Sequence, residues 1–206
     1  MIVDPAGLTG DAMYRLMTSV VVPRPIAFVS TRSASGQRNL APFSYFNAIS
    51  SSPPLIGITF SERADDPKDT LRNIRETGEF VVNLVSEPLL GAMAKTAGEW
   101  PRGVDEFEVA GLAPAPARRV QAPRVAESPI HLECRLFREI ALGNGVLVVG
   151  EIVLAEISDD VMTDGRVDPL KLKAVGRLSG EFYSLMREVV KAPRPRVSRA
   201  TGEPIA

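Results

Sequence analysis

Two long apolar patterns joined by one tight turn constrain the fold of this chain more than any other feature. The segments Ile130 to Leu142 and Val146 to Ile157 are connected through Gly143-Asn144-Gly145. Asn-Gly between two apolar runs is a strong hairpin signal. Shorter strand patterns lie at Ile26 to Thr31, at about 40–50 and 55–61, at Glu79 to Val85 and at Ala174 to Leu178. Many strands, with few helices in irregular order between them, predict a mainly β antiparallel barrel that is closed or partly closed.

The same patterns predict a small number of peripheral helices. One follows Thr9-Gly10-Asp11 and continues to Val20, and another follows Ser86 and ends near Gly98. A third has Asp66 as its N-cap and Pro67 at its first position, where the missing N–H costs nothing. Its buried residues are Leu71 and Ile74, and Gly78 lies just past its end. The segment Ser179 to Val190 is also predicted to be helical.

Two segments are expected to lie outside the barrel. Glu99 to Ala126 is rich in Pro, Gly and charge, which predicts an excursion over the barrel surface towards a partner subunit. From Lys191 onwards, four basic residues and three prolines show no periodicity. We therefore expect one domain over residues 1–190, followed by a flexible basic tail over residues 191–206.

Composition limits the function classes. The chain has 206 residues, 45% hydrophobic content and a formal charge of −1, which suits one sizeable core and gives no electrostatic footprint for nucleic acid. No run of about eighteen apolar residues predicts a membrane span. The stretch Met1 to Asp11 has two acids and no basic region, which argues against a signal peptide. A single cysteine fits a reducing compartment. These features together predict a cytoplasmic globular protein.

The residues that usually carry chemistry are scarce. His131 and Cys134 are the only histidine and cysteine. Residues three apart on a strand point to opposite faces, so the two side chains do not form a dyad. Cys134 alternates with apolar neighbours and is expected to be a core residue. Zinc sites, Gly-x-Gly-x-x-Gly and the Walker A sequence are all missing. If the protein does chemistry, we expect a cofactor to carry it, with no catalytic side chain and no metal.

Two segments suit a planar ring joined to a phosphate. The stretch Asn39 to Ala48 mixes small residues, aromatics and short polar side chains, so its backbone can approach a flat ring. Lys68-Asp69-Thr70 offers amides, an ammonium and a hydroxyl to an anion near a helix start. Pro42 cannot donate to a neighbouring strand, which either admits a ligand or marks only an edge or bulge. The aromatics are either ligand contacts or barrel core, and alternation places Tyr45 opposite Ser44 and Phe46.

The order of several motifs resembles the flavin reductase-like family with the FMN-binding split barrel. The motifs are Val22-Pro23-Arg24-Pro25-Ile26-Ala27-Phe28-Val29-Ser30-Thr31, Asn39 to Ala48, Lys68-Asp69-Thr70-Leu71-Arg72-Asn73-Ile74, Phe80-Val81-Val82-Asn83, Glu127-Ser128-Pro129, Leu132-Glu133-Cys134 and Val175-Gly176-Arg177-Leu178. The resemblance covers roughly Val20 to Tyr183. It implies a Greek-key barrel, a homodimer, and FMN bound near the subunit interface.

The resemblance also implies a set of cofactor-binding residues: Arg24, Asn39, Ala41, Pro42, Phe43, Ser44, Tyr45, Lys68, Asp69 and Thr70. Asp69 would repel a phosphate, so we expect its carboxylate to turn away and support the helix start. Arg24 is either a contact for the phosphate or the flavin pyrimidine oxygens, or a surface arginine in a linker. Arg177 and Tyr183 also match family positions, without an assigned role.

The function implied is an FMN-binding oxidoreductase that transfers hydride from NADH or NADPH to flavin N5. Reduced flavin would then serve a partner monooxygenase, or stay bound and reduce an electron-acceptor protein. The alternative is a non-catalytic FMN-binding electron carrier, and a barrel used only for protein interaction would be colourless. Sequence does not distinguish NADH from NADPH, or tightly bound FMN from diffusing FMN.

Overall fold

The largest element of this computed structural model, which describes residues 1–61 and 67–201, is a seven-stranded antiparallel sheet. Its strand order is β3-β2-β6-β9-β10-β5-β4. The strands are β2 (Ala27–Arg32), β3 (Arg38–Phe43), β4 (Phe46–Ser51), β5 (Pro54–Ser61), β6 (Glu79–Leu84), β9 (Ile130–Leu142) and β10 (Gly145–Ile157). Every neighbouring pair is antiparallel, which confirms the predicted mainly β fold.

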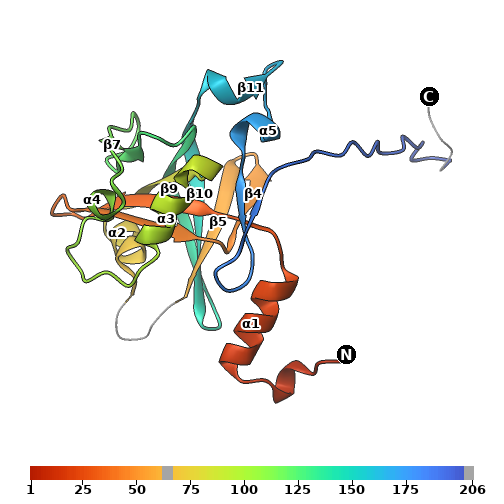
Figure 1. Cartoon of the computed structure of the whole chain (residues 1–206), viewed down its shortest axis with the longest axis horizontal. Coiled ribbons are helices and arrows are strands. Elements are labelled where there is room, and N and C mark those ends of the chain that lie inside the picture. Colours follow the sequence, from red (N-terminus) through yellow and green to blue (C-terminus); the bar gives the residue numbers. More distant parts are fainter. Residues whose placement is uncertain (62–66, 202–206) are drawn as a thin grey trace.

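The two edge strands of this sheet are consecutive in the chain. β3 ends at Phe43 and β4 begins at Phe46, so only Ser44 and Tyr45 connect them. The sheet must therefore curl until its edges approach each other, and the rings of Phe43 and Phe60 lie 4.5 Å apart between centroids. The single strand expected at about 40–50 is wrong, because the chain crosses here from one edge of the barrel to the other. Figure 1 shows the strongly curved sheet.

The long hairpin is confirmed. Leu142 pairs with Gly145, which leaves a two-residue turn of Gly143 and Asn144. Gly143 has φ of 59°, a left-handed conformation that favours glycine. Further along β10 the register shifts at Val149/Gly150, and the ring of Phe80 occupies the space that a Cβ on Gly150 would need.

The core has two layers, because β2 buries both of its faces. The barrel interior holds Ala27, Val29, Phe43, Ile56, Ile58, Phe60, Leu71, Ile74, Phe80, Val82, Cys134, Val146 and Val148. A second cluster outside β2 holds Ile26, Phe28, Leu40, Val85, Leu89, Met93, Phe107, Ala110, Leu112, Val125 and Val175. The outer layer is formed largely by α3 (Leu90–Thr96) and α4 (Glu106–Ala110), while α2 (Asp69–Thr77) contributes Leu71 and Ile74 to the interior.

Three of the expected helices are present. In α1 (Gly10–Val20), the Thr9 hydroxyl accepts from Ala12 N at 3.2 Å, and the helix extends away from the barrel (Figure 1). The helix α2 ends at Gly78, whose φ is 70°, as predicted. Its predicted start is wrong: the N-cap is Lys68, so Pro67 precedes the helix, and Asp66 lies outside the described residues. A 3₁₀ turn, η2 (Glu87–Leu89), leads into α3.

The expected helix over Ser179 to Val190 is wrong. The segment instead forms a hairpin with the preceding strand, in which Tyr183 to Leu185 pair with Arg177 to Val175. Gly180, with φ of 57°, lies in the turn. Tyr183 and Leu185, two residues apart and thus on one face of the strand, both pack against the outer core.

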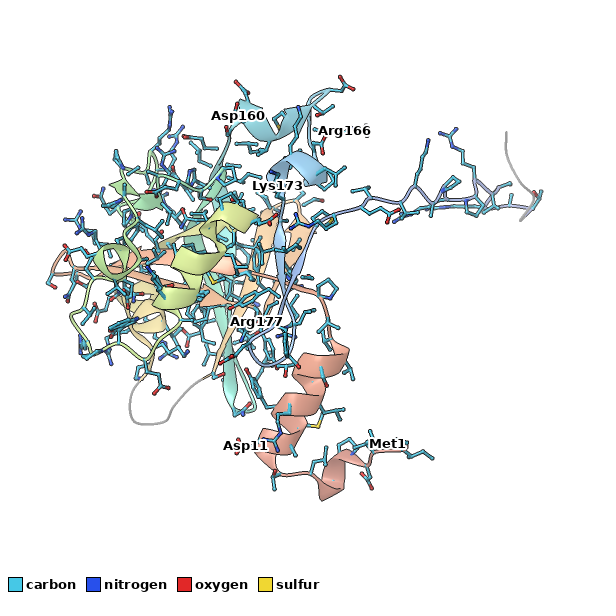
Figure 2. All side chains as sticks on the ribbon, in the orientation of Figure 1. Met1, Asp11, Asp160, Arg166, Lys173 and Arg177 are labelled. Carbon is cyan, nitrogen blue, oxygen red and sulfur yellow. The ribbon has the colours of Figure 1, made fainter. Side chains whose placement is uncertain are left out.

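The short elements complete the fold. They are η1 (Pro5–Gly7), β1 (Arg24–Pro25), β7 (Pro114–Ala115), β8 (Arg124–Val125), η3 (Asp159–Val161), β11 (Met162–Thr163), β12 (Arg166–Val167), α5 (Pro169–Leu172), β13 (Val175–Arg177) and β14 (Tyr183–Leu185). In Figure 2, Met1 and Asp11 lie far from the barrel, whereas Arg177 lies on the side from which α1 projects. The chain beyond β14 runs outwards (Figure 1), and its flexibility, like the single-domain assignment, stays a prediction.

The excursion over residues 99–126 lies on the sheet, as expected. Glutamates of the sheet accept hydrogen bonds from its backbone. The fully buried Glu133 carboxylate accepts from Arg118 N at 2.9 Å and from Arg119 N at 2.6 Å. Glu79 accepts from Gln121 N at 2.8 Å. Buried carboxylates that receive backbone N–H groups satisfy polar groups that would otherwise be costly to bury. Within the part of the chain that the structure describes, no helix is long and apolar enough to cross a membrane.

Candidate functional site

Two adjoining cavities lie along the edge strand β3. The first, about 210 Å³, borders the start of α2. Its lining residues are Asn39, Ala41, Pro42, Pro67, Lys68, Asp69, Thr70, Thr96, Ala97, Gly98, Glu99, Trp100, Arg102 and Glu106. The second, about 170 Å³, is lined by Tyr14, Ile26, Pro42, Phe43, Ser44, Met93, Ala97, Arg177 and Tyr183. Pro42 and Ala97 line both, so the two cavities meet there. Eight of the ten residues named from the sequence line one cavity or the other.

The α2 end of the first cavity can receive an anion. Lys68 is the N-cap, and Arg72 N donates to Lys68 O at 3.0 Å as the first bond of the helix. The N–H groups of Asp69, Thr70 and Leu71 therefore have no acceptor within the helix. The partial positive charge of the helix start and the Lys68 ammonium, 5.6 Å from the Phe43 ring centroid, favour a negatively charged group.

Asp69 brings a negative charge to this end of the cavity, and two arginines balance it. Its Oδ1 lies 2.8 Å from Arg72 Nη1 and 3.9 Å from Arg102 Nε. Arg102 also lines the cavity. Sequence reasoning missed Arg102, because it lies in the excursion, thirty-three positions from Asp69, and no local pattern brings the two together. The carboxylate supports the helix start through Arg72, and its relation to a bound phosphate stays a prediction.

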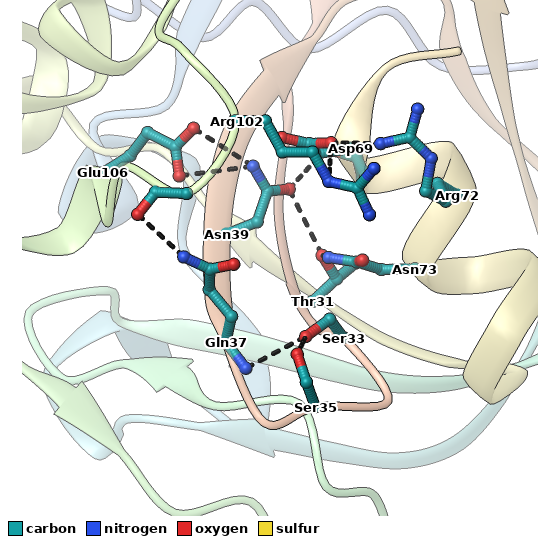
Figure 3. Close-up of polar contacts among 12 residues, drawn as sticks. Thr31, Ser33, Ser35, Gln37, Asn39, Asp69, Arg72, Asn73, Arg102 and Glu106 are labelled. Atoms are coloured by element: carbon teal, nitrogen blue, oxygen red, sulfur yellow. Dashed lines mark hydrogen bonds and ion pairs between the residues drawn. The ribbon is translucent and has the colours of Figure 1, made fainter. Parts of the chain in front are cut away.

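A buried polar network centred on Asn39 forms part of the wall of the first cavity, and Figure 3 shows its contacts. Asn39 is 7% exposed and Thr70 is 1% exposed. The Thr70 hydroxyl donates to Asn39 Oδ1 at 2.7 Å, and the Thr31 hydroxyl donates to the same oxygen at 3.2 Å. On its other side, Asn39 Nδ2 donates to both oxygens of Glu106 at 3.1 and 3.2 Å. The Thr70 hydroxyl hydrogen is thus directed at Asn39, and its role in binding an anion stays a prediction.

Glu106 is the buried acidic residue in this network, and no sequence pattern pointed to it. Its Oε2 accepts from Leu40 N at 3.0 Å, besides the two bonds from Asn39. Burial raises the pKa of the Glu106 carboxyl, and the nearby Asp69 charge acts in the same direction. The hydrogen bonds from the Leu40 and Glu106 backbone and from Asn39 oppose this rise in pKa. The N–H groups that surround the carboxyl thus favour its ionised form, while burial and Asp69 favour its protonated form.

Arg24 is buried and holds several segments together. It is 6% exposed, so the alternative of a surface arginine in a linker is wrong. Its guanidinium donates to the carbonyls of Thr18 and Val21 at 2.8 and 2.9 Å, at the end of α1. It also donates to Leu178 O at 2.9 Å and, through Nε, to Ser44 Oγ at 3.4 Å. Arg24 fixes the position of Ser44 relative to α1, while its contact with a cofactor stays a prediction.

Aromatic side chains surround the second cavity. Tyr45, in the connection between β3 and β4, lies with its ring centroid 6.0 Å from the Arg24 guanidinium. Partial burial and the nearby Tyr14 raise the pKa of Tyr45, and the Arg24 charge lowers it. The Arg177 guanidinium lies 4.6 Å from the Tyr183 ring centroid. Tyr45 does not line this cavity, but the rings of Tyr14, Phe43 and Tyr183 do, and together with the Arg177 cation they suit a flat conjugated ring.

His131 and Cys134 lie on opposite faces of β9, as predicted. Cys134 is fully buried in the barrel interior, and burial raises the pKa of its thiol, so it remains protonated at neutral pH. His131 Nδ1 lies 3.0 Å from Asn83 Oδ1, which also accepts from Val125 N at 2.9 Å in the outer layer. Among the described residues, no group of three or more His, Cys, Asp or Glu side chains could hold a metal ion.

The curled antiparallel sheet has the split-barrel fold of known structures, such as that from Shewanella frigidimarina, with which it shares a TM-score of 0.83 over 94% of this chain. Residues 17–171 match the flavin reductase like domain. The chain belongs to the flavin reductase-like family, which confirms the resemblance drawn from the sequence and indicates a flavin-related oxidoreductase role.

Three relatives show how much of the chain this similarity covers. An uncharacterized protein of Halalkalibacterium halodurans is 39% identical over 206 residues, which is 97% of this chain and 99% of that protein. The structure of nitrilotriacetate monooxygenase component B from Bacillus cereus is 34% identical, with a TM-score of 0.90 over 93% of this chain and 98% of the other. The 2-nitrobenzoate 2-nitroreductase of Pseudomonas fluorescens is 32% identical, with a TM-score of 0.87 over 98% of this chain and 100% of that one.

Proposed function

We propose that this protein is an FMN-dependent oxidoreductase that takes hydride from NADH or NADPH. The observation that supports the proposal best is the pair of cavities that meet at Pro42 and Ala97. One has an anion-binding end at the start of α2, and the other has apolar and aromatic walls. A ligand with a phosphate at one end and a flat ring at the other matches this arrangement.

The chain's own residues would bind and orient the cofactor. Lys68 and the first N–H groups of α2 would bind the phosphate, and the backbone of Ala41 to Ser44 would border the ring and the ribityl chain. Paired strands end at Phe43 and resume at Phe46, so the backbone of Ser44 lies outside the strand ladder. Arg24 would orient Ser44 through its guanidinium. When bound, FMN accepts hydride from a nicotinamide and passes electrons onwards, which requires no histidine or thiolate from the protein.

The electron acceptor is proposed from the relatives. One similar structure is a component of nitrilotriacetate monooxygenase, and another is a nitroreductase. We propose that this chain likewise supplies electrons to a second reaction, either to a partner monooxygenase or to an acceptor bound beside the flavin. We place the protein in the cytoplasm, where its single thiol would remain reduced.

Nicotinamide oxidation tests the proposed function directly. The purified protein, supplied with FMN, is mixed with NADH or NADPH, and the fall in absorbance at the nicotinamide band is followed. We expect oxidation that depends on both FMN and protein. Protein that holds FMN but leaves both nicotinamides unoxidised would be an electron carrier instead. Protein that binds no flavin would refute the proposal.

We also propose that the protein is a two-fold symmetric homodimer. The helix α1 projects from the barrel and exposes large apolar side chains, with Tyr14 61%, Met17 41% and Val20 63% exposed. Ile49 on β4 is 45% exposed as well. An apolar helix face of this kind is costly to leave in water. A second copy of the chain is the occupant that we infer, and because Tyr14 of α1 also lines the second cavity, the interface would lie next to that cavity.

A further inference from the structure

Glu106 controls the direction of a chain of hydrogen bonds that ends at the proposed phosphate site. Leu40 N donates to Glu106 Oε2, and a carboxylate can only accept, so Asn39 must present its NH₂ group to Glu106. The Asn39 oxygen then faces the two threonine hydroxyls, both of which must donate to it. Asn73 Nδ2 in turn donates to Thr31 Oγ1 at 2.9 Å, which occupies an acceptor position of that hydroxyl.

We propose that Glu106 is a positioning residue which, through Asn39, directs the Thr70 hydroxyl hydrogen away from the cavity. The inference deepens the proposed function and rests on it. Thr70 lines the first cavity and lies in the first turn of α2. With its hydrogen directed at Asn39, the hydroxyl offers only lone pairs to the cavity. The wild-type site therefore recognises the phosphate through N–H groups and cations.

Replacing the Glu106 carboxylate by an amide is expected to reverse the direction of these hydrogen bonds. In Glu106→Gln, the new amide oxygen accepts from Leu40 N, and its NH₂ group faces Asn39. We expect the Asn39 amide to rotate, because its NH₂ group would otherwise lie against the new NH₂ group at the position of Oε1, so that its own NH₂ group faces Thr31 and Thr70. The Thr70 oxygen becomes an acceptor, and its hydrogen is released to donate to a phosphate oxygen. Among the described residues, the Asn39 amide makes hydrogen bonds only with Glu106, Thr31 and Thr70, so no other side chain opposes its rotation.

A double-mutant cycle tests this inference. The four proteins are the wild type, Thr70→Val, Glu106→Gln and the double variant. For each, fluorescence titration gives the Kd for FMN and the Kd for riboflavin, and the ratio of riboflavin Kd to FMN Kd measures the contribution of the phosphate. Circular dichroism confirms the fold. Glu106→Gln also removes a negative charge near the phosphate, but that effect is the same with Thr or Val at position 70, so it cancels in the cycle.

We expect Thr70→Val to reduce the ratio of riboflavin Kd to FMN Kd about tenfold more in the Glu106→Gln background than in the wild-type background. A factor of about ten corresponds to the loss of one charge-assisted hydrogen bond to the phosphate. An equal effect of Thr70→Val in both backgrounds overturns the inference while leaving the proposed function intact. Failure of the wild type to bind either flavin refutes the proposed function, and this inference with it.

Acid provides a second measurement that does not need the Glu106 variant. Protonation of Glu106 allows the same rotation of Asn39, so the effect of Thr70→Val on the ratio should grow as pH falls. The other charged groups that line this cavity are Lys68, Asp69, Glu99 and Arg102, and all four are present both in the wild type and in Thr70→Val. Asp105, next to Glu106, is paired with Arg38. A pH-independent effect of Thr70→Val contradicts the proposed role of Glu106.

Discussion

The Lys68→Ala variant tests the position of the phosphate site. Lys68 is the exposed N-cap of α2 and lies on the rim of the first cavity. A charge-assisted hydrogen bond contributes about 1.5–3 kcal/mol. Solvent exposure places Lys68 at the lower end of that range, and Arg102 and the free N–H groups of α2 remain after the substitution. We therefore expect FMN binding to weaken about tenfold, since about 1.4 kcal/mol corresponds to a factor of ten.

Riboflavin, which lacks the phosphate, distinguishes a local effect from a structural one. Its Kd should change little in Lys68→Ala, because the ring and ribityl contacts that we propose lie along β3. The matched control is Lys191→Ala, which removes the same charge from the C-terminal segment that leads away from the barrel. Titration of flavin fluorescence at two salt concentrations measures both affinities, and the difference for FMN should shrink at high salt. Equal weakening of both flavins, or an equal effect of Lys191→Ala, would refute this placement of the site.

Three further substitutions test the core, the buried histidine and the proposed dimer. Gly150→Ala forces a methyl group against the Phe80 ring and should lower the free energy of unfolding by about 1–3 kcal/mol in urea titrations, whereas Gly91→Ala on open α3 should not. Burial lowers the pKa of His131 below its unfolded value of about 6.5. The wild type should therefore lose stability as pH falls below about 6.5, more steeply than His131→Gln, while both turn over NADH or NADPH. Met17→Glu on the exposed face of α1 should yield monomers by light scattering, and an unchanged molar mass would place the interface elsewhere.

Local patterns predicted the elements of the fold well, because each depends on residues close together in the chain. The hairpin of β9 and β10, the Thr9 cap of α1 and the glycine at the end of α2 all follow from short-range chemistry. The failures have tertiary causes. Ser44 and Tyr45 look like strand residues, but they lie where the chain crosses between the two edges of the sheet. The segment around Tyr183 has helix-compatible spacing, yet pairing with β13 makes it a strand.

The residues of the candidate site likewise fall into those that local motifs predicted and those that only the fold brings to the cavity. Asn39, Lys68 and Thr70 could be proposed from the sequence because each lies in a motif that the family shares. Arg102 and Glu106 could not, since the excursion that carries them has no periodicity and reaches the cavity only through the fold. Arg102 places a cation beside Asp69, and Glu106 places a carboxyl group beside Asn39. Thr70 illustrates this difference. Its residue type suggests a hydroxyl that donates a hydrogen bond to a phosphate, whereas in the structure the buried hydroxyl donates to Asn39 instead.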